Sequence, residues 1–298
     1  MMKLNIWTKN VCTKVNEIHR YTPDLFYKCH WQRKKGVNPF YLIYRQCVAC
    51  LFVVICILSF YRPEDRERHK IQYFKWFIYL TNWGFFTCTV QSILGAYITM
   101  KRYLELRKKP DLEDEDVKMS RLYKTYWIVH NASVPTAFAI TAIYWAAVYD
   151  PKIDPLTVMT FLVHGVNSAL MFLDILLVAH PFRLADFCYP FFFVVLYIFF
   201  SIVYYLTGGT DRLHRRYIYN ILNWQYPVKS VMVVSITTAF LFLLHVLTWL
   251  LSLYKFHVKP PKVPETLPTH NEVELPPEGA TVVDDASATP TKVDQSAD

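Results

Sequence analysis

Six long apolar stretches dominate the hydrophobic pattern of the chain. Each is close to the roughly 20 residues that an α-helix needs to cross a hydrocarbon core of about 30 Å. The stretches lie near residues 41–61, 72–100, 123–149, 156–180, 187–207 and 229–254. The loops at 150–155 and 181–186 are very short, so the spans that they join are expected to be antiparallel neighbours. The pattern predicts an all-α, polytopic membrane helix bundle with about six transmembrane helices.

The same pattern divides the chain into three parts. Residues 1–40 form a basic N-terminal segment with eight Lys and Arg residues, and residues 41–254 form the six-helix transmembrane domain. Residues 255–298 contain seven of the seventeen prolines and eight acidic residues, but almost no aromatic residue. Because such a composition buries too little apolar surface to fold, a disordered cytosolic tail is predicted there.

The distribution of Lys and Arg predicts the orientation of the bundle. With the N-terminus in the cytosol, the cytosolic segments are 1–40, 101–124, 181–186 and 255–298, and the opposite loops are 62–71, 150–155 and 208–228. The cytosolic segments then carry 21 basic residues and the opposite loops carry 8. Under the positive-inside rule, this difference places both termini in the cytosol. The first 30 residues have no apolar core of the signal-peptide type, so the first span is expected to be an uncleaved anchor.

Composition agrees with a membrane protein and excludes some other classes. The net charge is +8, and aromatic residues make up 17% of the chain. The basic N-terminal residues alternate with aromatics such as Trp7, Tyr27 and Trp31, which indicates a membrane-surface segment rather than a nucleic-acid module. Seven cysteines are an odd number and five lie in predicted spans, so a disulfide framework is not expected. Cys47 and Cys50 form a C-x-x-C without a second pair and are expected to be small packing residues.

Small and polar residues form a stripe along two of the predicted spans. The stripe on the second span consists of Thr81, Gly84, Cys88, Gln91, Ser92 and Gly95, opposite the bulky Phe86 and Tyr97. The stripe on the fourth span consists of His164, Asn167, Ser168, Met171 and Asp174. Because small and polar side chains let helices approach and bond each other, both stripes are expected to face other helices rather than lipid.

Thr81 and His164 are predicted to lie at one depth. They follow the starts of their spans by nine and eight residues, which corresponds to roughly 12 to 14 Å below the outer edge. A hydroxyl becomes a nucleophile when a base lies within hydrogen-bond reach, and imidazole is the usual partner. Thr81 and His164 are therefore a candidate catalytic pair. The alternative is that Thr81 bonds a backbone carbonyl one turn back and His164 serves packing alone.

Other polar residues within the spans support weaker hypotheses. His130, Asp174 and His245 all fall toward the cytosolic side and could gather as ligands of zinc or iron. No two of them share a span, so no ligand spacing supports the set, and neither a metal nor another cofactor is expected. Arg45 lies near the cytosolic end of the first span and is expected only to anchor it by snorkelling. A transporter is a third possibility, but no inverted repeat or pair of broken spans is evident.

Eight short blocks occur in a characteristic order along the chain. They are residues 76–84 (WFIYLTNWG), 140–145 (ITAIYW), 164–167 (HGVN), 173–174 (LD), 189–190 (YP), 208–209 (GG), 218–219 (IY) and 223–224 (NW). In this order they resemble the rolling stone family of insects and other animals, over about residues 20 to 255. The resemblance implies a multi-pass membrane protein, and the founding insect member is associated with myoblast fusion.

More distantly, the pattern resembles the androgen-induced membrane hydrolases, which cleave fatty acid esters of hydroxy fatty acids with an intramembrane Thr and His. Their Thr follows an aromatic–Leu pair in an early span, as Thr81 follows Tyr79 and Leu80. Their His opens a later span, as His164 does. The resemblance implies Thr81 as the nucleophile and His164 as the base. Asp174 lies ten residues after His164, or about 15 Å along a helix, and is too far away to orient the imidazole.

The sequence therefore predicts a rolling stone-like protein with a role in myoblast fusion or related membrane events. The alternative function is an intramembrane lipid-ester hydrolase. The expected partners are the lipid bilayer, a lipid ester substrate, and unknown proteins that bind the loops or the tail, but no nucleic acid. The expected location, the plasma membrane, follows from the resemblance.

Overall fold

The computed structural model describes residues 23–61, 74–111, 119–152 and 156–259. Within these ranges the regular secondary structure is helical, apart from two isolated β-bridges. The long helices are α2 (Pro39–Tyr61), α4 (Leu80–Lys108), α5 (Arg121–Ile143), α7 (Asn167–Leu177), α8 (Cys188–Leu206) and α9 (Pro227–Val258). The short ones are η1 (Pro23–Phe26), η3 (Lys75–Ile78), η4 (Tyr144–Val148), α6 (Val158–Phe161), η5 (Leu162–Val166) and η6 (Leu184–Phe187). Residues 255–258 of the predicted disordered tail are instead the end of α9, because Lys255 and Phe256 are buried there, and residues 260–298 lie outside the described residues.

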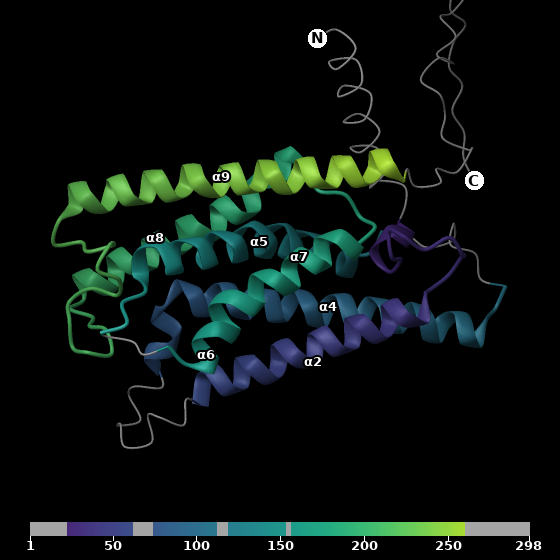
Figure 1. Cartoon of the computed structure of the whole chain (residues 1–298), viewed down its shortest axis with the longest axis horizontal. Helices are drawn as coiled ribbons and strands as arrows, with labels where there is room; N and C mark the ends of the chain where they lie inside the picture. The colour runs from purple at the N-terminus through teal and green to yellow at the C-terminus, as the bar shows by residue number, and fades with distance from the viewer. Residues whose placement is uncertain (1–22, 62–73, 112–118, 153–155, 260–298) are drawn as a thin grey trace, which may run out of the picture. The chain divides into compact units, whose positions relative to one another are not determined.

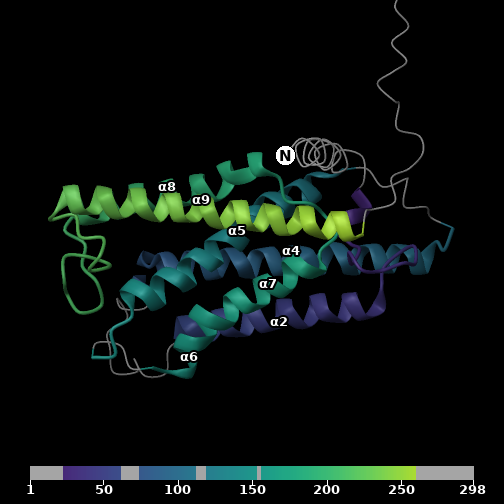
Figure 2. The same cartoon turned by 45° about the horizontal axis from the view of Figure 1, so that its top comes forward.

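The helices form one bundle around α5 (Figure 1). Helix α5 contacts α4, α7, α8 and α9, and α2 and α9 lie on opposite sides of the bundle in both views (Figure 2). The end where residues 23–38 pack and α9 stops is called the terminus side. The opposite end, which carries the connection between α8 and α9 at residues 207–226 (the 207–226 loop), is called the loop side.

Four helical segments of the described chain are long and apolar enough to cross a membrane, judged by length and composition. They are Pro39–Tyr61, Val158–Leu177, Leu184–Leu206 and Pro227–Val258. Helices α4 and α5, with 29 and 23 residues, are also of spanning length. They carry more polar residues because their neighbours in the bundle shield them and bond those groups. The prediction of an all-α membrane bundle with about six transmembrane helices is confirmed.

Both predicted stripes face the interior of the bundle. On α4 the side chains or backbone of Gly84, Cys88, Gln91, Ser92 and Gly95 are buried, whereas Phe86 and Tyr97 are 53% and 55% exposed. On the other span His164, Asn167, Met171 and Asp174 are buried, and Ser168 bonds Thr141 and the carbonyl of Ala137 on α5. The small residues allow close approach, since a Cβ at Gly95 would lie 3.1 Å from both the Arg45 guanidinium and the Tyr126 ring.

The helix that carries Thr81 begins later than the pattern predicts. The predicted span 72–100 is interrupted at Tyr79, whose backbone is extended (φ −91°, ψ 126°), and α4 runs on to Lys108. Three side chains stabilise this break by donating to successive carbonyls of η3. They are Asn82 Nδ2 to Trp76 O (2.7 Å), Trp83 Nε1 to Phe77 O (2.5 Å) and Tyr197 OH to Ile78 O (2.9 Å). The placement of Thr81 nine residues into its helix is therefore wrong, because Thr81 is the second residue of α4.

The described part of the N-terminal segment packs into the terminus side of the bundle. Phe26 and Tyr27 are fully buried in a cluster with Ile98, Tyr126 and Trp127 of α4 and α5. The expectation of a membrane-surface segment therefore does not hold for residues 23–30, whose aromatic side chains find a protein core instead. Residues 1–22 lie outside the described part of the chain.

Three groups from distant parts of the chain cap the C-terminal end of α7. The last carbonyls of a helix have no partner within it. Here the His30 backbone N–H donates to Leu177 O (2.8 Å) and the Trp31 indole N–H to Leu176 O (2.8 Å). Lys255 Nζ, from α9, donates to Ile175 O and to Val178 O (2.8 Å). Because a cation at a helix C-terminus also offsets the helix dipole, this cap ties both ends of the described chain to α7.

Lowering the pH is expected to destabilise this end of the bundle through His30. Burial, followed by the charge of Lys255, lowers the pKa of His30 from 6.5 to about 4. Between these two values the unfolded chain binds a proton that the folded chain does not bind. The contribution of His30 to stability is therefore complete above pH 6.5 and decreases as the pH falls toward 4.

We expect the midpoint temperature of thermal unfolding in detergent to be lower at pH 5 than at pH 7. This decrease should be smaller in His30→Gln. The exposed His257, substituted in the same way, provides the control and should keep the pH dependence of the original chain. Equal pH dependence in the original chain and in His30→Gln would contradict this role.

Candidate functional site

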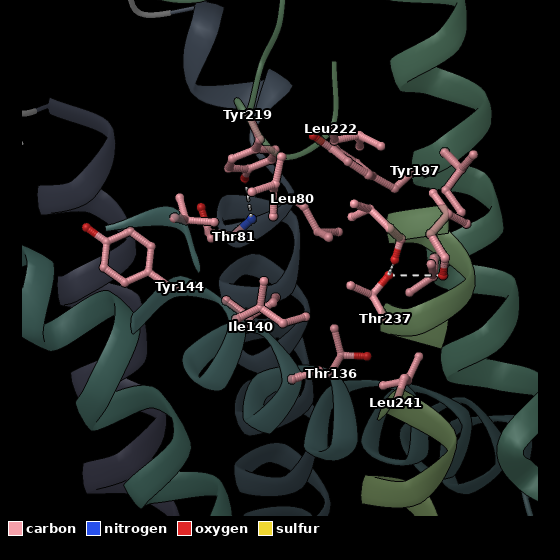
Figure 3. A pocket seen from close by; sticks show the side chains of 18 residues that line it. Leu80, Thr81, Thr136, Ile140, Tyr144, Tyr197, Tyr219, Leu222, Thr237 and Leu241 are labelled. Carbon is pink, nitrogen blue, oxygen red and sulfur yellow. Dashed lines mark hydrogen bonds between the residues drawn. The ribbon is translucent and has the colours of Figure 1, made fainter. Parts of the chain in front are cut away.

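A cavity of about 110 Å³ lies on the loop side, between α4, α5, α8, α9 and the 207–226 loop. Its wall is mostly aliphatic. The polar side chains that line it are Thr81, Thr136, Tyr144, Tyr197, Tyr219 and Thr237. Figure 3 shows Tyr219 and Leu222 at one end of the cavity and Thr136 and Leu241 at the other. An apolar cavity with a few polar groups is typical of a small-molecule or lipid site.

Thr81 lines this cavity and is half-buried. Its backbone N–H points to the hydroxyl oxygen of Tyr219 at 3.4 Å. The predicted alternative, a bond to a carbonyl one turn back in α4, is not possible for the second residue of a helix. Thr87, two turns further on, does make such a bond, to Trp83 O at 2.8 Å.

His164 lies in η5, a single π-helical turn that interrupts the fourth span between α6 and α7. Its ring stacks on Tyr144, with 3.5 Å between ring centroids and 3° between the planes. Tyr144 begins η4, a second π-helical turn, at the end of α5. Inserted π-turns of this kind often occur at functional sites because they re-aim side chains. Here the two turns bring Tyr144 and His164 face to face.

Tyr144 links the two predicted catalytic residues. It lines the cavity together with Thr81 and carries the His164 ring on its face. His164 itself is buried and is not among the described residues that line the cavity. The indole N–H of Trp145 donates to the His164 carbonyl (3.1 Å), which holds the π-turn in place. Tyr144 thus contacts the imidazole of His164 and also lines the cavity that Thr81 lines.

A second polar cluster is buried toward the terminus side, and Asp174 is its centre. Asp174 Oδ1 accepts from Arg45 Nη1 (2.6 Å), and Oδ2 lies 3.0 Å from His130 Nε2 and 2.9 Å from Gln91 Nε2. Arg45 donates further to the hydroxyls of Tyr41 (2.9 Å) and Tyr126 (2.8 Å). The side chains of Arg45 and Asp174 are each 1% exposed. We call these six side chains the Asp174 network.

The Asp174 network corrects the expectation for Arg45 and bears on the hypothesis of a metal set. Arg45 does not snorkel to the membrane surface, because Gly95 leaves room for its guanidinium inside the bundle and Asp174 neutralises it there. The proposed metal set is not assembled either. His130 contacts Asp174, but His245 bonds Arg183 O (3.1 Å) and packs on Phe187. Within the described residues, no group of three or more His, Cys, Asp or Glu side chains could hold a metal ion.

Sequence reasoning missed two members of the cavity site, Tyr144 and Tyr219. Both belong to blocks that were quoted for the family resemblance, so a signal was present. Neither residue type is distinctive in an aromatic-rich chain, and the contacts that give them a role come from elements far away in the sequence. Periodicity within one helix cannot show such contacts.

Comparison with known proteins identifies the relatives of this chain. The family model described as "Protein rolling stone" matches residues 6–261. Protein rolling stone of Drosophila melanogaster is 30% identical over 250 residues, which cover 80% of this chain and 84% of the relative. No solved structure gives a significant match.

Removal of one charged partner from the Asp174 network is expected to lower the free energy of unfolding by about 3–5 kcal/mol, because a buried charge is left without its partner. Asp174→Ala should show this loss in detergent unfolding experiments. The double variant Arg45→Met with Asp174→Leu should lose less than Asp174→Ala, since no unpaired charge remains. Lys101→Ala is the control: its pair with Glu105 is long (4.0 Å), and both side chains are about half exposed. A loss for Asp174→Ala as small as for Lys101→Ala would refute the assignment.

Proposed function

Because the chain belongs to the rolling stone family, we propose that it acts in membrane events such as the fusion of myoblasts. The helix bundle and its apolar segments support a multi-pass membrane protein. The excess of basic residues in segments 1–40, 101–124, 181–186 and 255–298 supports an orientation with both termini in the cytosol. On this orientation the cavity opens in the outer half of the plasma membrane.

We further propose that the chain is an intramembrane lipid-ester hydrolase. One observation carries this proposal: the half-buried residue Thr81 lines an apolar cavity, together with Tyr144 and Tyr219. The aliphatic wall suits an acyl chain, and Thr81 would then face the ester group at the end of that chain. The substrate would enter sideways from the outer leaflet.

In this reaction Thr81 Oγ attacks the carbonyl carbon of the ester while its proton passes to the imidazole of His164. Apo geometries of catalytic groups are often loose, and one water can bridge them. His164 then returns the proton to the departing alcohol, which leaves an acyl group on Thr81. Water, activated by the same imidazole, releases the acid and restores the hydroxyl. The role of Tyr144 in this scheme is to hold the imidazole beside the cavity through ring stacking.

The competing proposal is a scaffold without catalysis. In that case the loops and the tail bind partner proteins, and the interior polar groups serve only to hold the helices together. The Asp174 network supports part of this view, because it is fully buried and its charges are satisfied internally. The two proposals differ in whether the Thr81 hydroxyl is chemically reactive.

An alkyl fluorophosphonate probe is expected to label the purified protein on Thr81. Labelling should disappear in Thr81→Ala and decrease by about 10²-fold or more in His164→Ala, which is the usual contribution of a general base. Thr87→Ala, on the same helix, and His257→Ala, which alters an exposed side chain, should be labelled like the original chain. Labelling that survives both Thr81→Ala and His164→Ala would exclude the hydrolase proposal.

A cell-fusion experiment separates the two classes of function. Cultured myoblasts depleted of their own protein are expected to fuse less, and the original chain should restore fusion. If lipid hydrolysis serves fusion, Thr81→Ala should not restore it although the variant reaches the cell surface, whereas Thr87→Ala should. Full rescue by Thr81→Ala would assign fusion to the scaffold, and absence of any effect of depletion would remove the fusion proposal.

A further inference from the structure

Helix α4 begins beside the cavity, and its first two residues line the cavity wall. The first four N–H groups of a helix have no partner within it. In α4 the N–H groups of Asn82 and Trp83 bond Tyr79 O, at 3.0 and 3.3 Å. Those of Leu80 and Thr81 remain, and both residues line the cavity. They interact with tyrosine hydroxyls from other elements, Tyr219 among them.

Tyr219 is fixed over this helix start by the 207–226 loop. Its ring packs edge to face on Tyr79, with 5.9 Å between centroids, and its backbone forms a bridge with Leu222. The loop itself is anchored on α8, where the Trp224 indole donates to Ser201 Oγ (3.1 Å). It is also anchored beside η3, where Lys75 Nζ donates to Asp211 O (2.6 Å). These contacts hold the Tyr219 ring and backbone beside the helix start, where its hydroxyl needs only a small shift to make room for another oxygen atom.

The contact between Tyr219 and α4 is nevertheless weak. A separation of 3.4 Å between the Thr81 nitrogen and the hydroxyl oxygen is long for a hydrogen bond. A helix of 29 residues also carries partial positive charge at its start. The pair of N–H groups would therefore bind a more negative oxygen better than it binds a neutral tyrosine hydroxyl.

An independent observation comes from a second polar residue of the cavity lining, whose hydroxyl has no hydrogen-bond partner. Thr136 lines the far part of the same cavity and is 2% exposed. Its hydroxyl oxygen has no hydrogen-bond partner in the described structure. A buried hydroxyl without a partner is costly, and a bound ligand or water would remove that cost.

We propose that the N–H groups of Leu80 and Thr81, together with the hydroxyl of Tyr219, form an oxyanion-binding site for the ester carbonyl. This inference rests on the proposed hydrolase function and adds to it the groups that stabilise the transition state. In the resting state the Tyr219 oxygen accepts from Thr81 N–H. When substrate binds, the carbonyl oxygen takes that position and the Tyr219 hydroxyl donates to it.

The charges in this step balance. The bond between Thr81 Oγ and the carbonyl carbon forms as the π-electron pair of the C=O group moves onto the carbonyl oxygen. The Thr81 proton moves to His164, and the oxyanion receives hydrogen bonds from the helix start and from Tyr219. When this electron pair on the oxyanion re-forms the C=O bond, the bond between the carbonyl carbon and the alcohol oxygen breaks. The alcohol oxygen takes the proton from His164. Donors that are already in place lower the barrier, because they need no reorganisation.

The ionisation of Tyr219 is consistent with a donor role. Burial raises its pKa to about 12, although its bonds to Thr81 lower the pKa in part. The hydroxyl therefore keeps its proton at neutral pH and can donate it in a hydrogen bond throughout the reaction.

Tyr219→Phe tests this inference, because it keeps the ring that packs on Tyr79 and removes only the hydroxyl. With an alkyl fluorophosphonate, whose phosphoryl oxygen would occupy the same site, the maximal rate of labelling should fall about 10²-fold or more. The probe concentration at half-maximal rate should change little, since the apolar wall is intact. Thermal stability should stay close to that of the original chain.

Tyr204→Phe is the matched control. Its hydroxyl bonds Thr210 O (2.8 Å) in the same loop, but Tyr204 does not line this cavity. The probe should label Tyr204→Phe at the same rate as the original chain. Labelling of Tyr219→Phe at the original rate would overturn the oxyanion site and leave the hydrolase proposal standing. If the original chain shows no Thr81-dependent labelling, both proposals fail together.

Discussion

The ion pair between Arg45 and Asp174 constrains the whole bundle. Two opposite charges at the centre of a membrane domain must meet, because neither can be left alone in a low-dielectric interior without a large cost. Asp174 also takes His130 and Gln91, so α2, α4, α5 and α7 are fixed in register at one point. His164 lies on the same helical segment as Asp174, ten residues earlier. The network therefore also sets where the imidazole meets Tyr144, although it does not touch that ring.

Much of the fold could be predicted from the sequence, because residues on one face of a helix recur at a regular spacing. The spans follow from runs of apolar residues, and the inward faces of α4 and α7 follow from small and polar side chains at helical spacing. The role of Arg45 could not be predicted, since its distance from a helix end is compatible with snorkelling. Its burial depends on space above Gly95 and on a carboxylate 129 residues away. This burial is determined by how the helices pack together, and the sequence of a single helix does not show it.

The candidate site, too, could be predicted only in part from the sequence. Thr81 and His164 were predicted from residue type and from a resemblance in sequence blocks. In the structure Thr81 lines the cavity, and His164 stacks on Tyr144, another residue of the cavity lining. The break at Tyr79 could not be predicted, because the chain around it is as apolar as a continuous span. It depends on side-chain donors from Asn82, Trp83 and Tyr197 that take over the carbonyls of η3. The break matters for the proposed function, since it places a helix start inside a predicted span and beside the cavity.

The cap on α7 has a consequence for biosynthesis. A membrane chain is made and inserted from its N-terminus, and lipid offers no hydrogen bonds to bare carbonyls. Lys255, which bonds Ile175 O and Val178 O, is synthesised about 80 residues after the first of these acceptors. Until α9 has been inserted, the last turn of α7 depends on the N-terminal segment alone, through His30 and Trp31. Helix α9 thus completes the cap of a helix that was made long before it. A chain whose synthesis stops before α9 therefore lacks the Lys255 bonds to the last turn of α7.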